Sequence, residues 1–506
     1  MTNQKWKMGN GKWEMEIMVA RIIKHEWRNL TADRTAWVTL LLFALVIGYA
    51  SFKGQAWARH QEITLAQMRQ DEDERLGAIR KLIAEEERKA TEEGKPLAYP
   101  TWGPRHPAYI GIYRGQRYAA LPPAPLASLA VGQTDIYPNH FKVSAGLKES
   151  FLIAQETESP FKLLAGQFDP AFVIIYFYPL LILALTFNLV AAEKEDGTLR
   201  MLLSNRVRLR NIVLGKVAAR ALIIFSSAII FTLAGFALSS EAFEGGAIPR
   251  LLLWVCAVTF YGAFWFALGV AANAFGKSAA TNSLALAACY LAFVVVIPSL
   301  VNLGATTLYP VPSRIEFVNA MRAETQEANR QGSQLLARYF EDHPELAKPQ
   351  DTTSPFSKTG EDDFAMLSMA KDELVARRMK PLLDRFDAQL NYQNRLVNRF
   401  RYLSPAILMQ SLLYDITGAG VDRYQYFLRQ VDEYHQSWRR YFSPRIFEKR
   451  ALSSGDLAGL PLFQFAEESG AAVIKRVLWP GLAMALLTAL IGYAGLRAYR
   501  RFPIVG

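Results

Sequence analysis

The chain has 506 residues, a formal net charge of +11 and a sequence pI of about 9.4. Hydrophobic residues make up 51% of it and gather in windows of roughly 20 apolar residues, long enough to cross about 30 Å of hydrocarbon. This composition excludes an ordinary soluble protein and predicts a mainly α-helical, polytopic membrane protein with substantial parts in water. The basic residues flank the apolar windows, a pattern that argues against nucleic-acid binding.

The cysteine and histidine contents exclude two common kinds of site. Cys256 and Cys289 fall inside apolar windows, at depths that would differ by roughly 10 Å in antiparallel neighbours, too far for a disulfide. The six histidines are scattered, and none forms a pair at ligand spacing, so we expect no metal site. About 35 polar and amphipathic residues precede the first apolar window, as is typical of an uncleaved span and not of a signal peptide.

The first expected element is an imperfectly amphipathic helix over residues 13–34. Its apolar side carries Val19, Ala20, Ile23 and Trp27, with Trp13 and Ile17 at the edge. Such a helix can lie in the membrane interface with its tryptophans at headgroup depth. An ordinary juxtamembrane helix that only anchors the chain is the alternative.

Six membrane spans are expected, at 36–53, 169–192, 221–239, 251–272, 279–301 and 477–498. The second begins with Asp169 and Pro170, residue types favoured at the N-cap and at the first helical position. The segments outside the spans are 1–35, 54–168, 193–220, 240–250, 273–278, 302–476 and 499–506.

The distribution of lysine and arginine predicts the orientation of these spans. Basic residues near span ends are concentrated in 1–35, 193–220, 273–278 and 499–506, which six spans place on one side of the membrane. That side should be the cytoplasm, so both termini are expected there. The short loop 240–250 and two mostly helical domains, 54–168 after the first span and 302–476 after the fifth, are then external. The two domains could fold against each other.

Helical periodicity and turn residues outline these external domains. Residues 56–94 read as a long charged helix that ends at Gly94, followed by a proline-rich stretch of folded loop and short strand. Further helices are expected in 313–341, 361–400 and 421–441. A cluster of aromatic residues in the last of these is expected to be core and not a ligand site: Tyr424, Tyr426, Phe427, Tyr434 and Trp438.

The expected spans have no ionisable residue in their cores, which weakens the case for an ion-coupled carrier or an intramembrane hydrolase. Their polar residues, such as Asn188 and Asn282, are expected to form hydrogen bonds between helices. The segment "GVAANAFGKS" lacks the first glycine that a P-loop requires, because Ala271 stands at that position. ATP chemistry would therefore need a separate subunit.

The segment "AAEKEDGTLRMLLSNRVRLRNIVLGK", residues 191–216, carries the most distinctive pattern in the chain. The acids Glu193, Glu195 and Asp196 suit the start of a short helix at Gly197–Thr198. Its leucines would share one helical face at spacings of three and four: Leu199, Leu202 and Leu203. Such a helix could dock a partner, or it could pack under its own bundle, and the pattern leaves both readings open.

This segment resembles the coupling loop of type-two ABC-exporter permeases, which typically read Glu-x-x-x-Gly-Thr-Leu, two leucines, Ser-x-Pro-Val and a later Gly-Lys. The matching residues are Glu193, Gly197, Thr198, Leu199, Leu202, Leu203, Ser204, Val207, Gly215 and Lys216. Arg206 stands where that family usually has proline. The segments "LPPAPLASLAVGQTDIYP", "ESPFKLLAGQFDPAF" and "YLSPAILMQSLLYDITGAGVDRYQYFLRQVDEYHQSW" resemble a subfamily with two large external inserts, often described only as a domain of unknown function.

The resemblance implies a non-catalytic permease subunit of an ATP-driven exporter in the bacterial inner membrane. It implies two cytoplasmic ATPase subunits, which hold ATP and magnesium, and a second permease, identical or paralogous. Residues 1–35 would form an elbow helix that uses Trp13, Ile17 and Trp27. The residues expected to dock the ATPase are Glu193, Glu195, Gly197, Thr198, Leu199, Leu202, Leu203 and Arg206.

The sequence does not specify the substrate. The external domains would cap the exit or dock a periplasmic partner. A mechanical or assembly device that uses ATP to work on the cell envelope is the main alternative. An ion-coupled carrier is a weaker one.

Overall fold

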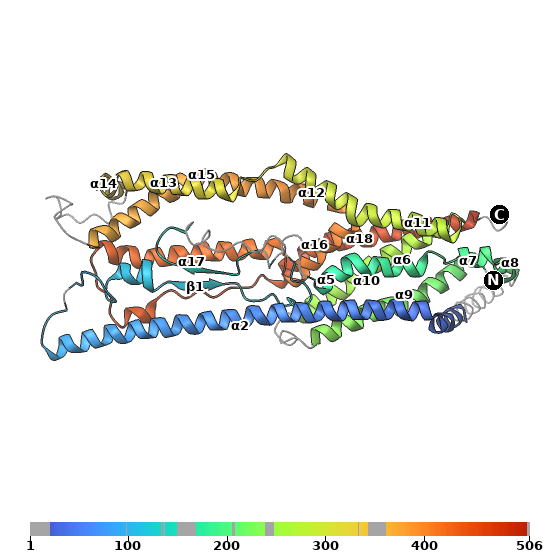
Figure 1. The fold of residues 1–506 in the computed structure, drawn as a ribbon, viewed down its shortest axis with the longest axis horizontal. Coiled ribbons are helices and arrows are strands. Elements are labelled where there is room, and N and C mark those ends of the chain that lie inside the picture. The colour runs from blue at the N-terminus through green and yellow to red at the C-terminus, as the bar shows by residue number, and fades with distance from the viewer. Residues whose placement is uncertain are drawn as a thin grey trace, which may run out of the picture.

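The computed structural model describes residues 21–97, 99–132, 134, 137–148, 168–204, 208–237, 247–331, 333–342 and 361–502. These residues form an elongated molecule with a helix bundle at one end and a second domain at the other (Figure 1). Within the described ranges, six helical segments are long and apolar enough to cross a membrane, which confirms the predicted multi-pass membrane protein. The six are Arg34–Glu92, Pro170–Glu195, Leu209–Ala237, Ala247–Asn273, Ala279–Leu308 and Gly470–Arg501.

The first of these, α2 (Arg34–Glu92), is a single helix of 59 residues. At about 1.5 Å per residue it is about 90 Å long, so it runs through the bundle and along the second domain (Figure 1). The Asp33 side chain caps its start by accepting from Thr35 N at 2.8 Å. It ends just before Gly94, which has a φ of +62° as predicted for a glycine stop. The predicted first span and the predicted charged helix are thus one element.

The membrane-crossing parts of the remaining spans consist of several helical segments. They are α5 (Pro170–Phe172), a π-helix (Val173–Phe177) and α6 (Tyr178–Thr186); α9 (Leu209–Ala237); α10 (Ala247–Asn273); α11 (Ala279–Tyr290), a π-helix (Leu291–Val296) and α12 (Ile297–Leu308); and α18 (Gly470–Ala498). The predicted start of the second span is confirmed, because Asp169 Oδ1 accepts from Phe172 N at 2.7 Å ahead of Pro170.

The second and fourth spans form the centre of the bundle. Tyr178 of α6 packs with Tyr261 and Trp265 of α10, and all three are fully buried. Trp254 is buried in the same cluster, so Trp254 and Trp265 are packing residues and not membrane-belt residues. The segment from α11 to α12 is instead the least buried of the six, as expected for an element that faces lipid or another subunit.

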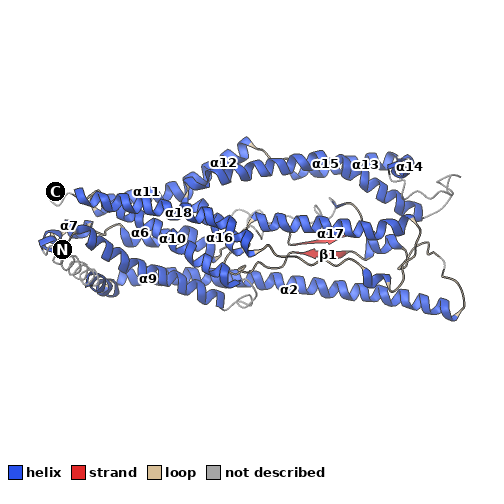
Figure 2. Ribbon diagram, turned by 180° about the vertical axis from the view of Figure 1, so that it is seen from behind, coloured by secondary structure: helices blue, strands red, loops and turns tan. Residues whose placement is uncertain are grey.

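We call the part of the molecule beyond the bundle the distal domain; it comprises the second half of α2, residues 95–148 and residues 309–469. Its helices are α13 (Arg314–Gln331), α14 (Ser333–Asp342), α15 (Glu361–Phe400), α16 (Pro405–Thr417) and α17 (Val421–Phe447), with short turns at Tyr109–Arg114, Arg401–Leu403 and Asp456–Gly459. The strands of the described residues, β1 (Arg117–Ala120) and β2 (His140–Val143), pair antiparallel (Figure 2).

The core of the distal domain joins residues from the two long segments, 54–168 and 302–476, that were predicted to lie on the same side of the membrane. Ile83 of α2 and Phe141 of β2 pack in one cluster with Phe427, Trp438 and Phe442 of α17. The predicted contact between the two segments is confirmed. Phe427, Tyr434 and Trp438 are core as predicted, Tyr424 packs against this core, and Tyr426 is only partly buried and lies outside the cluster.

Helix α16 belongs to the bundle and not to the distal core. Its apolar residues Leu408, Met409 and Leu412 are buried in the same cluster as Trp254 of α10 and Val473 of α18. Ser404 caps its start, and Gly418, with a φ of +84°, ends it. The distal domain therefore seats one of its own helices among the ends of the spans.

Candidate partner-docking site at the proximal end of the bundle

The second span is interrupted near the end of the bundle away from the distal domain, which we call the proximal end (Figure 1). Helix α6 ends at Thr186, residues 187–190 form a turn, and α7 (Ala191–Glu195) resumes the chain. A helix that ends inside a bundle leaves carbonyl groups without helical partners. Here four of them accept hydrogen bonds from side chains of other helices, so the break is held on several sides.

Each of these carbonyls has its own donor. They are Leu185 O with Arg220 Nη1, Thr186 O with Asn273 Nδ2 at 2.8 Å, Phe187 O with Asn282 Nδ2 at 3.4 Å, and Leu189 O with Lys216 Nζ at 3.0 Å. Two donors are cations, which the negative end of a helix favours. The donors come from α9, α10 and α11, so the break ties three other spans together.

The charged residues that follow the break bind their own chain. The buried Lys216 ammonium contacts the Glu193 carboxylate, and Lys194 Nζ donates to Gly276 O at 2.9 Å. Glu195 Oε1 accepts from Ala279 N, the first residue of α11, at 2.8 Å. The carboxylate thus lies at the positive end of the fifth span. Glu193 and Glu195, predicted to dock the ATPase, here anchor α7 to neighbouring helices.

Helix α8 (Thr198–Ser204) confirms the predicted short helix, and Gly197 before it has a φ of +73°, a conformation that favours glycine. Its leucine face points inward: Leu199 is 3% exposed, and Leu203 is partly buried in the same cluster, against Leu189, Val213 and Tyr499. Of the two readings of this face, the structure shows packing under the chain's own bundle for Leu199 and Leu203. The Leu202 side chain and Arg206 lie outside the described residues.

The outward side of α8 is what a partner could touch. Met201 is 77% exposed, and Gly197, Thr198 and Arg200 are exposed beside it. The turn after α10 is held next to α7 by the Lys194–Gly276 and Glu195–Ala279 bonds, and it carries Phe275, 73% exposed. We call Gly197, Thr198, Arg200, Met201 and Phe275 the docking edge. Sequence reasoning missed Met201 and Phe275, although an apolar residue within a polar turn is a readable signal.

Residues 21–32 form a helix at the same end of the bundle. Trp27 is partly exposed, and Trp13 and Ile17 lie outside the described residues. Glu26 is buried and accepts from Arg220 Nε at 2.9 Å. Sequence reasoning missed Glu26, which stands three residues after Ile23 and therefore on the apolar side of the helix.

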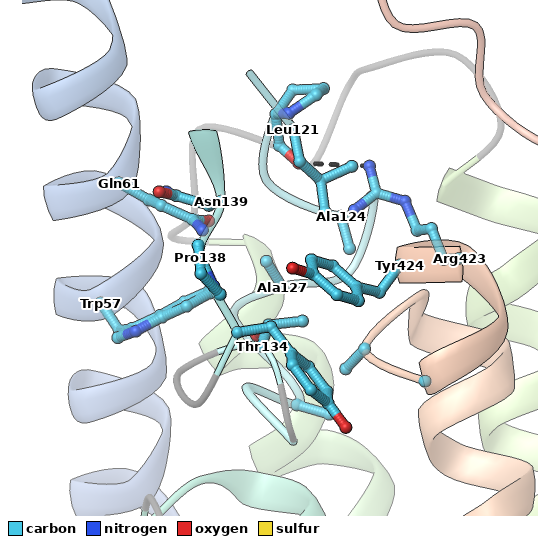
Figure 3. Close-up of a pocket in the computed structure, with 15 residues that line it drawn as sticks. Trp57, Gln61, Leu121, Ala124, Ala127, Thr134, Pro138, Asn139, Arg423 and Tyr424 are labelled. Carbon is cyan, nitrogen blue, oxygen red and sulfur yellow. Dashed lines mark hydrogen bonds between the residues drawn. The ribbon is translucent and has the colours of Figure 1, made fainter. Parts of the chain in front are cut away.

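One cavity among the described residues is too small for a substrate. It lies between α2, the proline-rich stretch and α17, and is lined by Trp57, Gln61, Leu121, Arg423 and Tyr424, among others (Figure 3). Arg423 donates to Pro122 O at 3.2 Å across its rim. Its volume of about 10 Å³ leaves room for about one water molecule.

No three His, Cys, Asp or Glu side chains gather as a metal site would need in the part of the chain that the structure describes. Cys256 and Cys289 are free thiols, as predicted.

Comparison with known proteins gives a match in part of the distal domain. The family described as "Domain of unknown function (DUF3526)" matches residues 314–466, from the start of α13 to the segment before α18. No curated protein and no solved structure matches the chain. The match covers α13 to α17 and does not include the proximal end, where the candidate docking site lies.

Proposed function

We propose that this chain is the membrane-spanning permease subunit of an ATP-driven ABC exporter. The observation that carries the proposal is the proximal end: α7 is bonded to α9 and α11, and the short helix α8 packs under the bundle through Leu199 and presents an exposed apolar edge around Met201. A permease that is moved by a separate ATPase needs an exposed contact surface that is held rigidly against its membrane spans. The resemblance of residues 193–216 to the coupling loop of such permeases supports the same assignment.

The contacts define how a movement of α8 would reach the spans. A displacement of α8 would act through Leu199 on α9, on α10 and on residues 496–502, because these share its cluster. It acts through Glu193 and Lys216 on α9, and through Glu195 on the start of α11. In this proposal ATP and magnesium bind two cytoplasmic ATPase subunits, and a second permease, identical or paralogous, completes the assembly.

The proposed setting is the bacterial inner membrane, with the proximal end in the cytoplasm and the distal domain in the periplasm. Basic residues at the proximal end support this orientation. The chain itself carries no catalytic role in this proposal, and the distal domain either caps the exit of the exported substrate or binds a periplasmic partner.

The docking edge gives a direct test of this function. Met201→Asp in the full chain should abolish co-purification of the ABC ATPase that the wild-type chain retains and leave the permease folded, because Met201 is exposed. Ile315→Asp, at a residue 73% exposed on α13, is the matched control and should retain the ATPase. Equal recovery of the ATPase with both variants would contradict the docking proposal.

One feature favours a second candidate, a mechanical device that works on the cell envelope without transport. Helix α2 is continuous from the proximal end into the distal domain, as a rod for transmitting force would be. Reconstituted vesicles separate the two functions: ATP-dependent accumulation of a substrate supports the exporter. An ATP-dependent distance change between spin labels on α2 and α15, with no accumulation, supports the mechanical device.

A further inference from the structure

A groove opens on the side of the bundle near its proximal end. It lies between the helix over residues 21–32, α2 and α9, and has a volume of about 380 Å³. We call it the lateral groove. Its apolar lining includes Trp27, Trp37, Leu41, Ala44, Ile223 and Ile230. A volume of this size is typical of a small-molecule site.

Helices α2 and α9 lie in close contact towards their distal ends. There, Gly235 of α9 has no side chain, and a Cβ atom at that position would lie 2.5 Å from Ser51 Oγ of α2. Gln55 of α2 also donates to the Gly235 carbonyl. Towards the proximal end both helices line the groove, together with the helix over residues 21–32. The Glu26–Arg220 pair holds that helix in place.

The lining selects for hydrocarbon. The hydroxyls of Ser226 and Ser227 donate to carbonyls of their own helix at 3.0 and 2.9 Å, and the Arg220 charge is neutralised by Glu26. Arg220, Ser226 and Ser227 therefore already have partners, and a polar ligand placed against them would lose hydrogen bonds to water without replacement. The walls also continue into the lipid-facing surface, because Leu41 and Ile230 are each about 60% exposed.

The mouth of the groove carries positive charge. Lys24 and Arg28 are exposed, and each stands three residues before a lining residue, Trp27 or Thr31, which places it on the same side of the helix. Arg21 and Arg34 are exposed nearby. The two acids in this stretch are already used: Glu26 pairs with Arg220, and Asp33 caps α2. The uncompensated charge at the mouth is positive, which attracts anionic headgroups.

We propose that the lateral groove binds one anionic phospholipid of the leaflet at the proximal end. An acyl chain lies between α2 and α9, and the phosphate lies against Lys24 and Arg28. This lipid site requires only that the chain is inserted in a membrane, and it does not require an ATPase partner. A failure of the lipid test would therefore leave the proposed exporter function untouched, and the reverse also holds.

Native mass spectrometry of the purified full chain, delipidated and mixed with defined lipids, tests the site. Phosphatidylglycerol and phosphatidylcholine with identical acyl chains are the probes. The wild-type chain should retain one phosphatidylglycerol at least several-fold more than phosphatidylcholine. Ala44→Trp, which fills the groove, should reduce retention of both to background. The double variant Lys24→Gln and Arg28→Gln should still bind an acyl chain in the groove, and it should retain the two lipids equally.

The control variant is Leu486→Trp, an equally bulky change at an exposed position of α18 outside the groove, which should behave as wild type. Ile230→Trp provides a second filling variant, so that misfolding of Ala44→Trp, seen by gel filtration, does not end the test. Undiminished phosphatidylglycerol retention in a folded filling variant would overturn the proposal, as would equal retention of the two lipids by the wild type.

Two other occupants give distinct results. If residues 1–20 occupied the groove, their deletion would raise lipid retention several-fold in the wild type. If a second copy of the chain occupied it, Ala44→Trp would shift the mass from dimer to monomer without changing lipid retention. Either result would overturn the lipid site.

Discussion

Arg220 of α9 and Glu26 of the N-terminal helix, 194 positions apart, form a buried ion pair with 2.9 Å between Arg220 Nε and Glu26 Oε1. Arg220 also donates to the carbonyl of Leu185 and, at 3.4 Å, to Asn188 Oδ1. One guanidinium therefore holds the N-terminal helix, the third span and the break in the second span together. Because the pair is buried, its removal should act on stability as well as on the position of the N-terminal helix.

A double-mutant cycle isolates this pair. Arg220→Met should lower the stability of the purified chain by about 3–5 kcal/mol, because it leaves the Glu26 carboxylate buried without a partner. Glu26→Gln should cost less, since its amide oxygen can still accept from Arg220. The double variant should be more stable than Arg220→Met alone. Thermal denaturation in detergent measures all three, and additive losses would show that the two side chains are not coupled.

The pairing of Glu26 with Arg220 marks the limit of what the sequence could predict. Six spans, the Asp169–Pro170 start and the aromatic core of α17 follow from local pattern, and the structure confirms them. The partner of Glu26 depends on which helices meet, and a contact across 194 positions leaves no local pattern. The same holds for the inward turn of Leu199, because an apolar helical face predicts burial but not the surface that buries it.

The side-chain amide of Asn273 supports the break in the second span. Its Nδ2 donates to Thr186 O at 2.8 Å and to Gly269 O at 2.9 Å, and the residue is buried. Asn273→Ala should destabilise the chain by about 1–3 kcal/mol, because the Thr186 carbonyl would lose its partner in a buried site. Asn302→Ala, at an exposed position of α12, is the control and should change stability by about 0.5 kcal/mol or less.

Loss of Asn273 should also loosen α7 and α8, which follow the break. Hydrogen exchange of residues 187–204 in the Asn273→Ala variant should therefore be faster than in the wild type, while exchange in α17 stays unchanged. Unchanged hydrogen exchange at 187–204 would show that the hydrogen bonds of Asn273 at the break do not stabilise α7 and α8. Asn273 itself was missed at the sequence level, because an asparagine near a span end has many possible partners.

The two glycines of α2 at positions 48 and 54 form a matched pair. A Cβ atom on Gly54 would overlap the Ser128 carbonyl oxygen, so the glycine allows α2 to touch the backbone of the proline-rich stretch. Nothing lies within 4 Å of a Cβ atom on Gly48. Gly48→Ala should stabilise the helix by about 0.5–1 kcal/mol, whereas Gly54→Ala should destabilise the chain by about 1–3 kcal/mol. Equal thermal shifts for the two variants would mean that the contact at Ser128 does not constrain α2.

The distal domain carries a buried histidine that should make its stability depend on pH. His435 Nε2 lies 2.8 Å from Gly146 O, and burial lowers the pKa of His435 to about 4, with Arg439 and Lys148 acting in the same direction. The hydrogen bond to Gly146 and the charge of Asp432 oppose this shift in pKa without cancelling it.

Between pH 6.5 and 4 the unfolded chain therefore binds a proton at His435 that the folded chain does not, so stability falls as the pH falls through this window. From pH 7 to pH 5 the loss is about 2 kcal/mol. His435→Gln can still donate to Gly146 O but cannot titrate, and should remove that part of the pH dependence. His60→Gln, at an exposed position of α2, should keep the wild-type slope. Thermal midpoints at pH 5 and pH 7 decide the matter: a slope unchanged by His435→Gln would show that other groups set the response to acid.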